Sequence, residues 1–251
     1  MKNLTFDHIY TIGEQVAETD LYTHFHYPEM LIRYDSNFIQ FKKMPNLQEF
    51  QQTAHYLRKF HQERGQKHVK FYFPENEKLP SELKEYLQKE KYDIGFMELY
   101  AIQPDQFPKT NANPKIEVQL VTNQNFNTYL ELQYEQDREY GKAFADQKIT
   151  LHQKSFDSNH IHQVIAFYKG EPAGSVDVIV GEETAEIDSL YVKETFRNNG
   201  IARHIQQFVM NTFSDKTSIL LADGDDTPRE MYRKQNYEFQ GYKYEATKVY
   251  E

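Results

Sequence analysis

One short segment has the residue types and the spacing needed to bind an anion through the protein backbone. It is the run Arg197-Asn198-Asn199-Gly200-Ile201-Ala202. A strand-forming run at 185–192 precedes it, and an amphipathic helical pattern begins at Ile201. A turn at such a junction presents unpaired N–H groups where the helix dipole favours an anion. Gly200 lets a phosphate approach the main chain, Ala202 keeps the next contact small, and Arg197 adds a charged donor. We therefore predict a pyrophosphate-binding turn.

The strand before this turn contains a break in its alternation. The two-residue spacing of apolar side chains is lost between Ile187 and Leu190, and Leu190 and Val192 restore it. This shift predicts a β-bulge, which bends a strand and changes the direction of its backbone groups.

A bulged strand that leads into a phosphate-binding turn resembles the acyl-CoA site of the GNAT acetyltransferase family. The order of predicted elements from Lys115 onward is similar too. They are a strand at 115–122, helices at about 125–140 and 144–156, strands at 161–168, 173–180 and 185–192, a helix from Ile201, a strand at 217–223, a helix that begins at Thr227-Pro228-Arg229-Glu230, and one or two strands at 237–250. The resemblance covers roughly the C-terminal half. It implies an α/β fold of the acyl-CoA N-acyltransferase type, with a mixed α+β sheet.

The resemblance also implies a cofactor, acetyl-CoA, and the residues that hold it. Backbone N–H groups near the bulge, at Leu190, Tyr191 and Val192, would polarise the thioester carbonyl. The remaining cofactor-binding residues would be Arg197, Asn198, Asn199, Gly200, Ile201, Ala202 and Arg203. This chain has Asn198 where the family frequently has glycine, although asparagine tolerates left-handed backbone better than most residues. It also has Asp223 near the position of a cofactor-facing asparagine, which puts one hydrogen bond in doubt.

Two residues are candidates for proton transfer in such a site. Tyr232 matches a helix tyrosine that many family members carry, whose phenol can protonate the departing thiolate. The alternative is an aromatic side chain that packs against the sheet. Glu186 lies where some members carry a catalytic carboxylate, and Asp188 shares its face if the strand alternation continues that far. A surface carboxylate, with the amine proton passing to water, is the alternative for both acidic residues.

Composition excludes several other classes of protein. The chain has no cysteine, which rules out disulfides, thiolate metal sites and cysteine nucleophiles. A net charge of -9 without a basic stripe argues against nucleic-acid binding and would tolerate a cationic amine. We expect no metal site, because His24 and His26 have no third ligand at suitable spacing and fit a surface or an interface. Neither a membrane span nor a signal peptide is recognisable, so the expected location is cytoplasmic.

The chain divides at a proline-rich segment, Gln103 to Pro114, which predicts domains at 1–108 and 114–251. The segment is too short for a long tether, so the halves should pack together. The first half predicts a strand pair or long bent strand at 30–42, a helix at 47–64, a strand at 68–73, a helix at 81–89 and a strand at 92–102. This order matches the rear portion of the second half.

Particular residues support an internal duplication. Tyr86 and Tyr92 match Tyr232 and Tyr237 with one inserted residue, but the turn position at 42–47 has no glycine. The prediction is therefore a tandem arrangement with a degenerate GNAT-like first lobe, in which only the second lobe binds cofactor. An unrelated α/β domain is the alternative.

The leading functional hypothesis is an N-acetyltransferase that acts on a primary amine of a small molecule or a peptide by direct attack. A non-catalytic acyl-CoA or small-ligand-binding protein of the same fold is the alternative. A third class, aminoacyl transfer from charged tRNA, fits the intact turn and the acidic balance poorly. We expect a monomer or a homodimer. The residues expected to line an acceptor pocket, or to fill the lobe interface, are Phe126, Tyr129, Tyr134, Tyr140, Phe144 and Tyr242.

Overall fold

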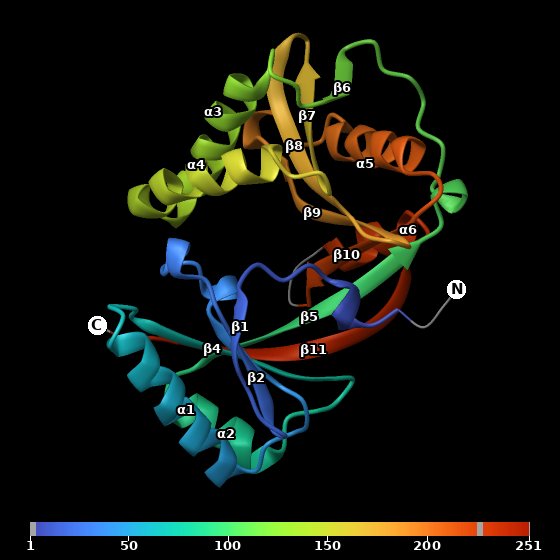
Figure 1. Cartoon of the computed structure of the whole chain (residues 1–251). Helices are drawn as coiled ribbons and strands as arrows, with labels where there is room; N and C mark the ends of the chain where they lie inside the picture. The colour runs from blue at the N-terminus through green and yellow to red at the C-terminus, as the bar shows by residue number, and fades with distance from the viewer. Residues whose placement is uncertain (1–3, 225–227, 251) are drawn as a thin grey trace.

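The computed structural model describes residues 4–224 and 228–250, which form one continuous mixed β-sheet flanked by helices (Figure 1). The strands are β1 (Glu14–Glu18), β2 (Tyr22–His26), β3 (Phe38–Phe41), β4 (His68–Glu75), β5 (Asp93–Ile102), β6 (Ile116–Leu120), β7 (Ile161–Tyr168), β8 (Glu171–Val180), β9 (Thr184–Val192), β10 (Thr217–Asp223) and β11 (Glu238–Val249). The helices are α1 (Leu47–Gln62), α2 (Ser81–Lys89), α3 (Phe126–Asp137), α4 (Lys142–Phe156), α5 (Ile201–Thr212) and α6 (Pro228–Lys234).

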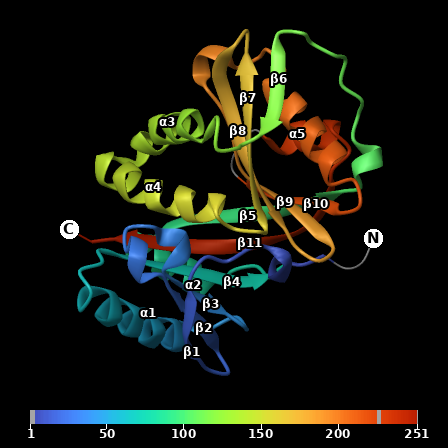
Figure 2. The same cartoon turned by 45° about the horizontal axis from the view of Figure 1, so that its top comes forward.

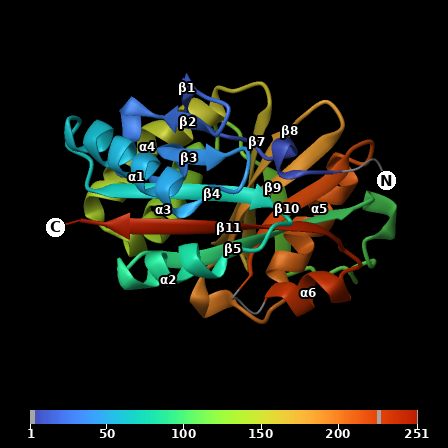
Figure 3. The same ribbon diagram turned by 90° about the horizontal axis from the view of Figure 1, so that it is seen from below.

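The two halves of the chain exchange their last strands. The sheet order is β1-β2-β3-β4-β11-β5-β10-β9-β8-β7-β6. Strand β5, from the first half, pairs with β10, whereas β11, from the second half, pairs with β4. The two exchanged strands also pair with each other, and they run side by side across the middle of the molecule (Figures 1 and 3). The expectation that the halves pack together is confirmed, since they share strand pairs as well as side-chain contacts.

Each lobe contains the same series of elements. The first lobe has β3–α1–β4–α2–β5 and the second has β9–α5–β10–α6–β11. In both series the first two strands are parallel, and the helix between them packs against one face of the sheet. The predicted repetition of elements between the two halves is thereby confirmed.

One predicted element of the first lobe is wrong. Residues 30–42 do not form a strand pair or a long bent strand, because only β3 is extended there. The Asn37 side chain donates to the carbonyl oxygens of Met30 and Arg33 and accepts from the N–H of Tyr27. These local bonds hold the preceding residues in short helical turns instead of a ladder. The strand pair of this lobe is the hairpin of β1 and β2.

The prediction for His24 and His26 also needs correction, because both side chains are buried in the first lobe. Buried His61 and His68 lie in the same region, and their ring centroids are 4.8 Å apart. Burial lowers the pKa of His24 and of His68 to about 3, and that of His61 to about 4. These histidines are therefore neutral core residues. Within residues 4–224 and 228–250, no cluster of three or more His, Asp or Glu side chains is arranged to hold a metal ion.

The second lobe follows its predicted elements closely. The turn between β7 and β8 is Lys169-Gly170, with φ of 53° and 85°, as the hairpin signal requires. Helices α3 and α4 pack on one face of the sheet and α5 packs on the other (Figure 2). The predicted helix start at Thr227 lies outside the described residues, and α6 begins at Pro228. In the described part of the chain, no helix combines the length and the apolar character that crossing a membrane requires.

Candidate active site

The predicted bulge in β9 is present. Ser175 of β8 pairs with Tyr191, whereas Asp177, two residues later, pairs with Asp188, so β9 contains one extra residue between these pairs. Ser189 has a φ of 55°, which is unusual for a residue other than glycine and marks the bulged position. The bulge bends β9 next to the predicted backbone donors Leu190, Tyr191 and Val192.

Strands β9 and β10 separate just before this bulge. Their parallel pairing runs from Thr184 opposite Thr217 to Glu186 opposite Ile219 and then stops. Beyond that point β9 continues to Val192 and β10 to Asp223 without pairing with each other. The two parallel strands therefore diverge beyond Glu186 and Ile219, which leaves a V-shaped opening in the ladder of hydrogen bonds between them.

The turn after β9 has the backbone conformation that an anion site needs. Asn198 and Gly200 have φ of 65° and 84°, and Gly200 is the N-cap of α5. No side chain caps this helix. Within the described residues, no group accepts a hydrogen bond from the N–H of Asn198, Asn199 or Gly200. These amides, together with the first N–H groups of α5, fit the phosphates of a nucleotide cofactor.

The two predicted arginines of this turn have protein partners. The Arg197 guanidinium lies 3.1 Å from Glu194 and is half exposed, so it can still face a ligand. Arg203 donates to the carbonyl oxygens of Pro108 and Lys109 in the interlobe segment. Arg203 therefore holds this segment against α5, a contact that the sequence did not predict.

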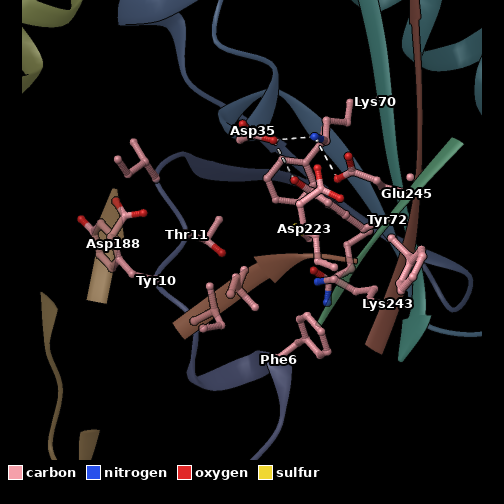
Figure 4. A pocket seen from close by; sticks show the side chains of 18 of the residues that line it. Phe6, Tyr10, Thr11, Asp35, Lys70, Tyr72, Asp188, Asp223, Lys243 and Glu245 are labelled. Carbon is pink, nitrogen blue, oxygen red and sulfur yellow. Dashed lines mark hydrogen bonds and ion pairs between the residues drawn. The ribbon is translucent and has the colours of Figure 1, made fainter. Parts of the chain in front are cut away.

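A cavity of about 680 Å³ lies between the lobes (Figure 4). Its lining residues Glu186 and Leu221 alternate along β9 and β10 with residues that pack with α5, so the cavity is on the opposite side of the sheet from α5. The second lobe contributes Glu186 and Asp188 from β9 and Leu221 and Asp223 from β10. Because these residues border the V-shaped opening, the cavity meets the opening directly. The other walls come from the N-terminal segment, the short turn at Asp35, β4, β5 and β11. Their residues include Phe6, Tyr10, Thr11, Asp35, Lys70, Tyr72, Lys243 and Glu245.

Glu186 occupies a position suited to accepting a proton. Its side chain is only 6% exposed, and its Oε2 accepts a hydrogen bond from the N–H of Tyr10 at 2.8 Å. Burial raises the pKa of Glu186 to about 8; the Tyr10 hydrogen bond opposes this rise and the Asp188 charge adds to it. Glu186 and Asp188 both line the cavity, so they share one face of β9. The carboxyl group thus titrates in the range that a general base at neutral pH needs.

Tyr232 lies on the opposite face of the sheet from Glu186. It packs against the core beneath α5, with its ring centroid 5.7 Å from that of Tyr100 and 5.5 Å from that of Tyr237. The structure therefore does not bring Tyr232 and Glu186 into one cavity.

The first-lobe wall of the cavity contains a charged cluster that sequence reasoning missed. Lys70 lies 2.5 Å from Asp35 and 3.0 Å from Glu245, and the Tyr72 hydroxyl donates to Asp35 at 2.9 Å (Figure 4). A signal was present, since Lys70 and Tyr72 alternate with apolar Val69, Phe71 and Phe73 along β4. That alternation indicates a strand with one apolar and one polar face, but not what the polar face covers.

The aromatic residues predicted to line a pocket have different roles. Tyr140 lines the cavity, and Phe144 borders an adjoining hollow of about 380 Å³. Tyr129 is buried, and its hydroxyl donates to Asp177 at 2.5 Å. Phe126 stacks on Phe156, with ring centroids 4.1 Å apart. The helix pair thus contributes to the cavity and its adjoining hollow mainly through the junction between α3 and α4.

Comparisons with known proteins agree with this geometry. The acetyltransferase (GNAT) family matches residues 126–237, which include β9, the turn and Tyr232. A domain of unknown function, DUF5613, matches residues 4–100. A search of curated proteins finds no match.

Solved structures extend the likeness to both lobes. A functionally unknown conserved protein from Staphylococcus epidermidis is 31% identical, with a TM-score of 0.91, and the match covers 99% of this chain and 98% of that one. A GCN5-related N-acetyltransferase from Kribbella flavida is 13% identical, with a TM-score of 0.62 and coverage of 94% and 89%. A tandem GNAT protein from the clavulanic acid biosynthesis pathway is 12% identical, with a TM-score of 0.52 and coverage of 84% and 75%. Residues 126–237 thus belong to the GNAT acetyltransferase family, and the whole chain has the two-lobe fold of tandem GNAT proteins.

Proposed function

We propose that the protein is an N-acetyltransferase that moves an acetyl group from acetyl-CoA to a primary amine. One arrangement carries the proposal. An uncapped helix start at Gly200 lies beside two separating parallel strands, and a buried carboxylate, Glu186, faces a cavity at the same opening. Cytoplasmic location and a monomeric or homodimeric state are part of the proposal.

The second lobe would hold the cofactor through main-chain groups. The N–H groups of Asn198 to Arg203 would bind the pyrophosphate, with the Arg197 side chain at the mouth of the turn. Backbone groups of Leu190, Tyr191 and Val192 would pair with the pantetheine arm and polarise the carbonyl. Acetyl-CoA supplies a thioester whose acetyl carbon is the electrophile.

Two side chains would move the protons of the reaction. Glu186 would accept a proton from the acceptor ammonium or from the attacking amine, and its pKa of about 8 suits that exchange. Tyr232 would donate the phenolic proton to the departing sulfur. The amine nitrogen gains the bond to the acetyl carbon as the carbon–sulfur bond breaks, so CoA leaves as a thiol.

Release of free thiol tests this proposal. Purified protein with acetyl-CoA and a panel of amines should liberate CoA, and Tyr232→Phe should lower kcat about tenfold to a hundredfold. Met231→Leu, one residue away on α6 and exposed, is a matched control that should keep the wild-type rate. Unchanged turnover in Tyr232→Phe would remove the acid assignment. Binding of CoA without turnover of any amine would favour the non-catalytic alternative.

A further inference from the structure

Lys243 is a buried lysine in the cavity that forms no ion pair with the residues that the structure describes. Its residue is 7% exposed, and its side chain extends from β11 into the cavity (Figure 4). Within residues 4–224 and 228–250, no carboxylate lies within 4.0 Å of its ammonium group. Three carboxylates act on it from a greater distance, those of Glu75, Asp7 and Glu245. Two of them have other contacts: Glu245 lies beside Lys70, and Glu75 accepts from the N–H of Phe6. A buried charge without a partner is costly and often marks a ligand site.

Lys70, on the same wall, is a lysine of this cavity whose charge is neutralised within the protein. It is equally buried, but it contacts two carboxylates, Asp35 and Glu245. Lys243 instead has aromatic rings as neighbours, since its ammonium lies 4.7 Å from the ring centroids of both Phe6 and Tyr72. Such cation–π contacts favour the charged form and fix its position, while they leave its hydrogen-bond donors unused.

The distance between Lys243 and Glu186 sets the shape of a ligand that reaches both. They lie on β11 and β9, and two strands, β10 and β5, separate these in the sheet. Three strand spacings amount to roughly 14 Å across the sheet. Along β5, Lys243 is level with Met97 and Glu186 with Ala101, which adds about 13 Å along the strands. The two backbones are therefore about 19 Å apart, a gap that the two side chains shorten. An amine at Glu186 and an anionic group at Lys243 must therefore be several bonds apart.

We propose that Lys243 binds a carboxylate of the acceptor, so that the acceptor class is an amine with a remote carboxylate. This inference rests on the proposed acetyltransferase function of the same cavity. An ω-amino acid and a short peptide that offers its N-terminal amine both have this chemistry. The α-amine and carboxylate of a single residue are too close together to reach both walls.

Electrostatics favour a carboxylate over a more highly charged anion. Burial lowers the pKa of Lys243 to about 8, against the raising influence of Glu75, Asp7 and Glu245, so the side chain is still largely protonated at neutral pH. The same acidic neighbours would repel a phosphate dianion more strongly than a single carboxylate.

Steady-state kinetics with matched acceptors test this inference. The acceptors to compare are 6-aminohexanoate and triglycine, which both carry a carboxylate, and hexylamine, which carries none. Lys243→Met, which nearly conserves volume and removes a buried charge, should raise KM for the preferred carboxylate acceptor about tenfold or more. Its kcat and the KM for hexylamine should stay within about twofold. Lys248→Met is the control, because Lys248 also lies on β11 over aromatic rings but outside the cavity.

Several outcomes would overturn the inference. One is an equal KM for hexylamine and the carboxylate acceptors in the wild-type enzyme, and another is an unchanged KM in Lys243→Met. Comparison of 6-aminohexanoate with triglycine separates an amino acid from a peptide. If no amine is acetylated, the proposed function fails, and calorimetry with 6-aminohexanoate then decides the role of Lys243. A heat of binding that is lost in Lys243→Met and kept in Lys248→Met would support the carboxylate site. If the wild-type protein shows no heat of binding, the carboxylate site is ruled out.

Discussion

The two lobes begin the helix that follows their first parallel strand in opposite ways. In the first lobe the Asn46 side chain accepts from the N–H of Glu49, and the Glu49 carboxylate accepts from the N–H of Asn46. In the second lobe Gly200 occupies the cap and offers no side-chain acceptor. The first lobe thus satisfies its helix amides internally and gains stability, whereas the second leaves them open for an anion. The same order of elements serves as support in one lobe and as a binding site in the other.

A second difference lies at the ends of the parallel pairings. The last residue of β9 that pairs with β10 is Glu186, and the last residue of β3 that pairs with β4 is Gln40. Both side chains line the cavity, from opposite lobes. A carboxylate can accept a proton from an amine and a carboxamide cannot, so only the second lobe has a base at this position.

Glu186→Gln would place in the second lobe the same side chain that the first lobe has at Gln40. We expect the largest effect on activity from this substitution. The kcat should fall about 10²–10⁴-fold at neutral pH, because a general base is lost. The wild-type rate should rise with pH up to about 8, where Glu186 ionises, and the variant should lose this dependence. Initial rates between pH 6 and 9 measure both. A variant that retains the wild-type profile would show that another group is the base.

Gly200→Asp would close the open helix start with an acceptor side chain. Asp tolerates left-handed backbone, and an added Cβ would lie 3.8 Å from His204, so the fold should persist. The new carboxylate would occupy the amides and repel phosphate, which should weaken CoA binding about a hundredfold, or about 2.7 kcal/mol. Calorimetry measures this change. Asn46→Gly, the corresponding change in the first lobe, should leave CoA affinity as it was; a loss there would contradict the comparison.

The buried histidines of the first lobe should make the folded protein less stable in acid than at neutral pH. The folded-state pKa values of His24, His61 and His68 lie below the unfolded value of 6.5. Their contribution to the free energy of unfolding is therefore complete above pH 6.5 and is lost as the pH falls. At pH 5 the loss is on the order of 2 kcal/mol per histidine.

Urea unfolding at pH 7 and pH 5 checks this dependence. His24→Phe keeps an aromatic ring next to Phe60, and it should reduce the difference in stability between the two pH values. An identical difference in the variant and the wild type would show that His24 is not one of the groups responsible.

The smallest expected effect concerns the closed helix start itself. Asn46→Ala removes the acceptor for the Glu49 N–H and should cost about 1 kcal/mol of stability. Asn46→Asp restores an acceptor and should recover most of the loss. Thermal unfolding measures both variants. Neither variant should gain affinity for CoA, because the first lobe has no glycine at its turn. A gain would mean that the Asn46 side chain is all that prevents the start of α1 from binding CoA.

Much of the second lobe could be predicted because its signals are local. The shift in the apolar alternation between Ile187 and Leu190 predicted the bulge, and the Lys169-Gly170 pair predicted the hairpin turn. Gly200 and Asn198 have the positive φ that their residue types favour. Each of these features depends on residues close together in the chain.

The cavity could not be predicted because it depends on strand exchange. Lys243 and Glu245 reach the first lobe only because β11 inserts between β4 and β5. The contact between the N–H of Tyr10 and Glu186 joins residues far apart in sequence. The failed prediction at residues 30–42 has a different cause, since the hydrogen bonds of the Asn37 side chain replace a strand ladder there.

The number of CoA molecules bound per chain is the most direct test of the difference between the lobes. Isothermal titration of the full chain with acetyl-CoA should show one site per chain, abolished by Gly200→Asp and preserved in Asn46→Gly. Two sites, no heat at millimolar concentration, or binding that persists in Gly200→Asp would contradict the assignment of the cofactor to the second lobe alone.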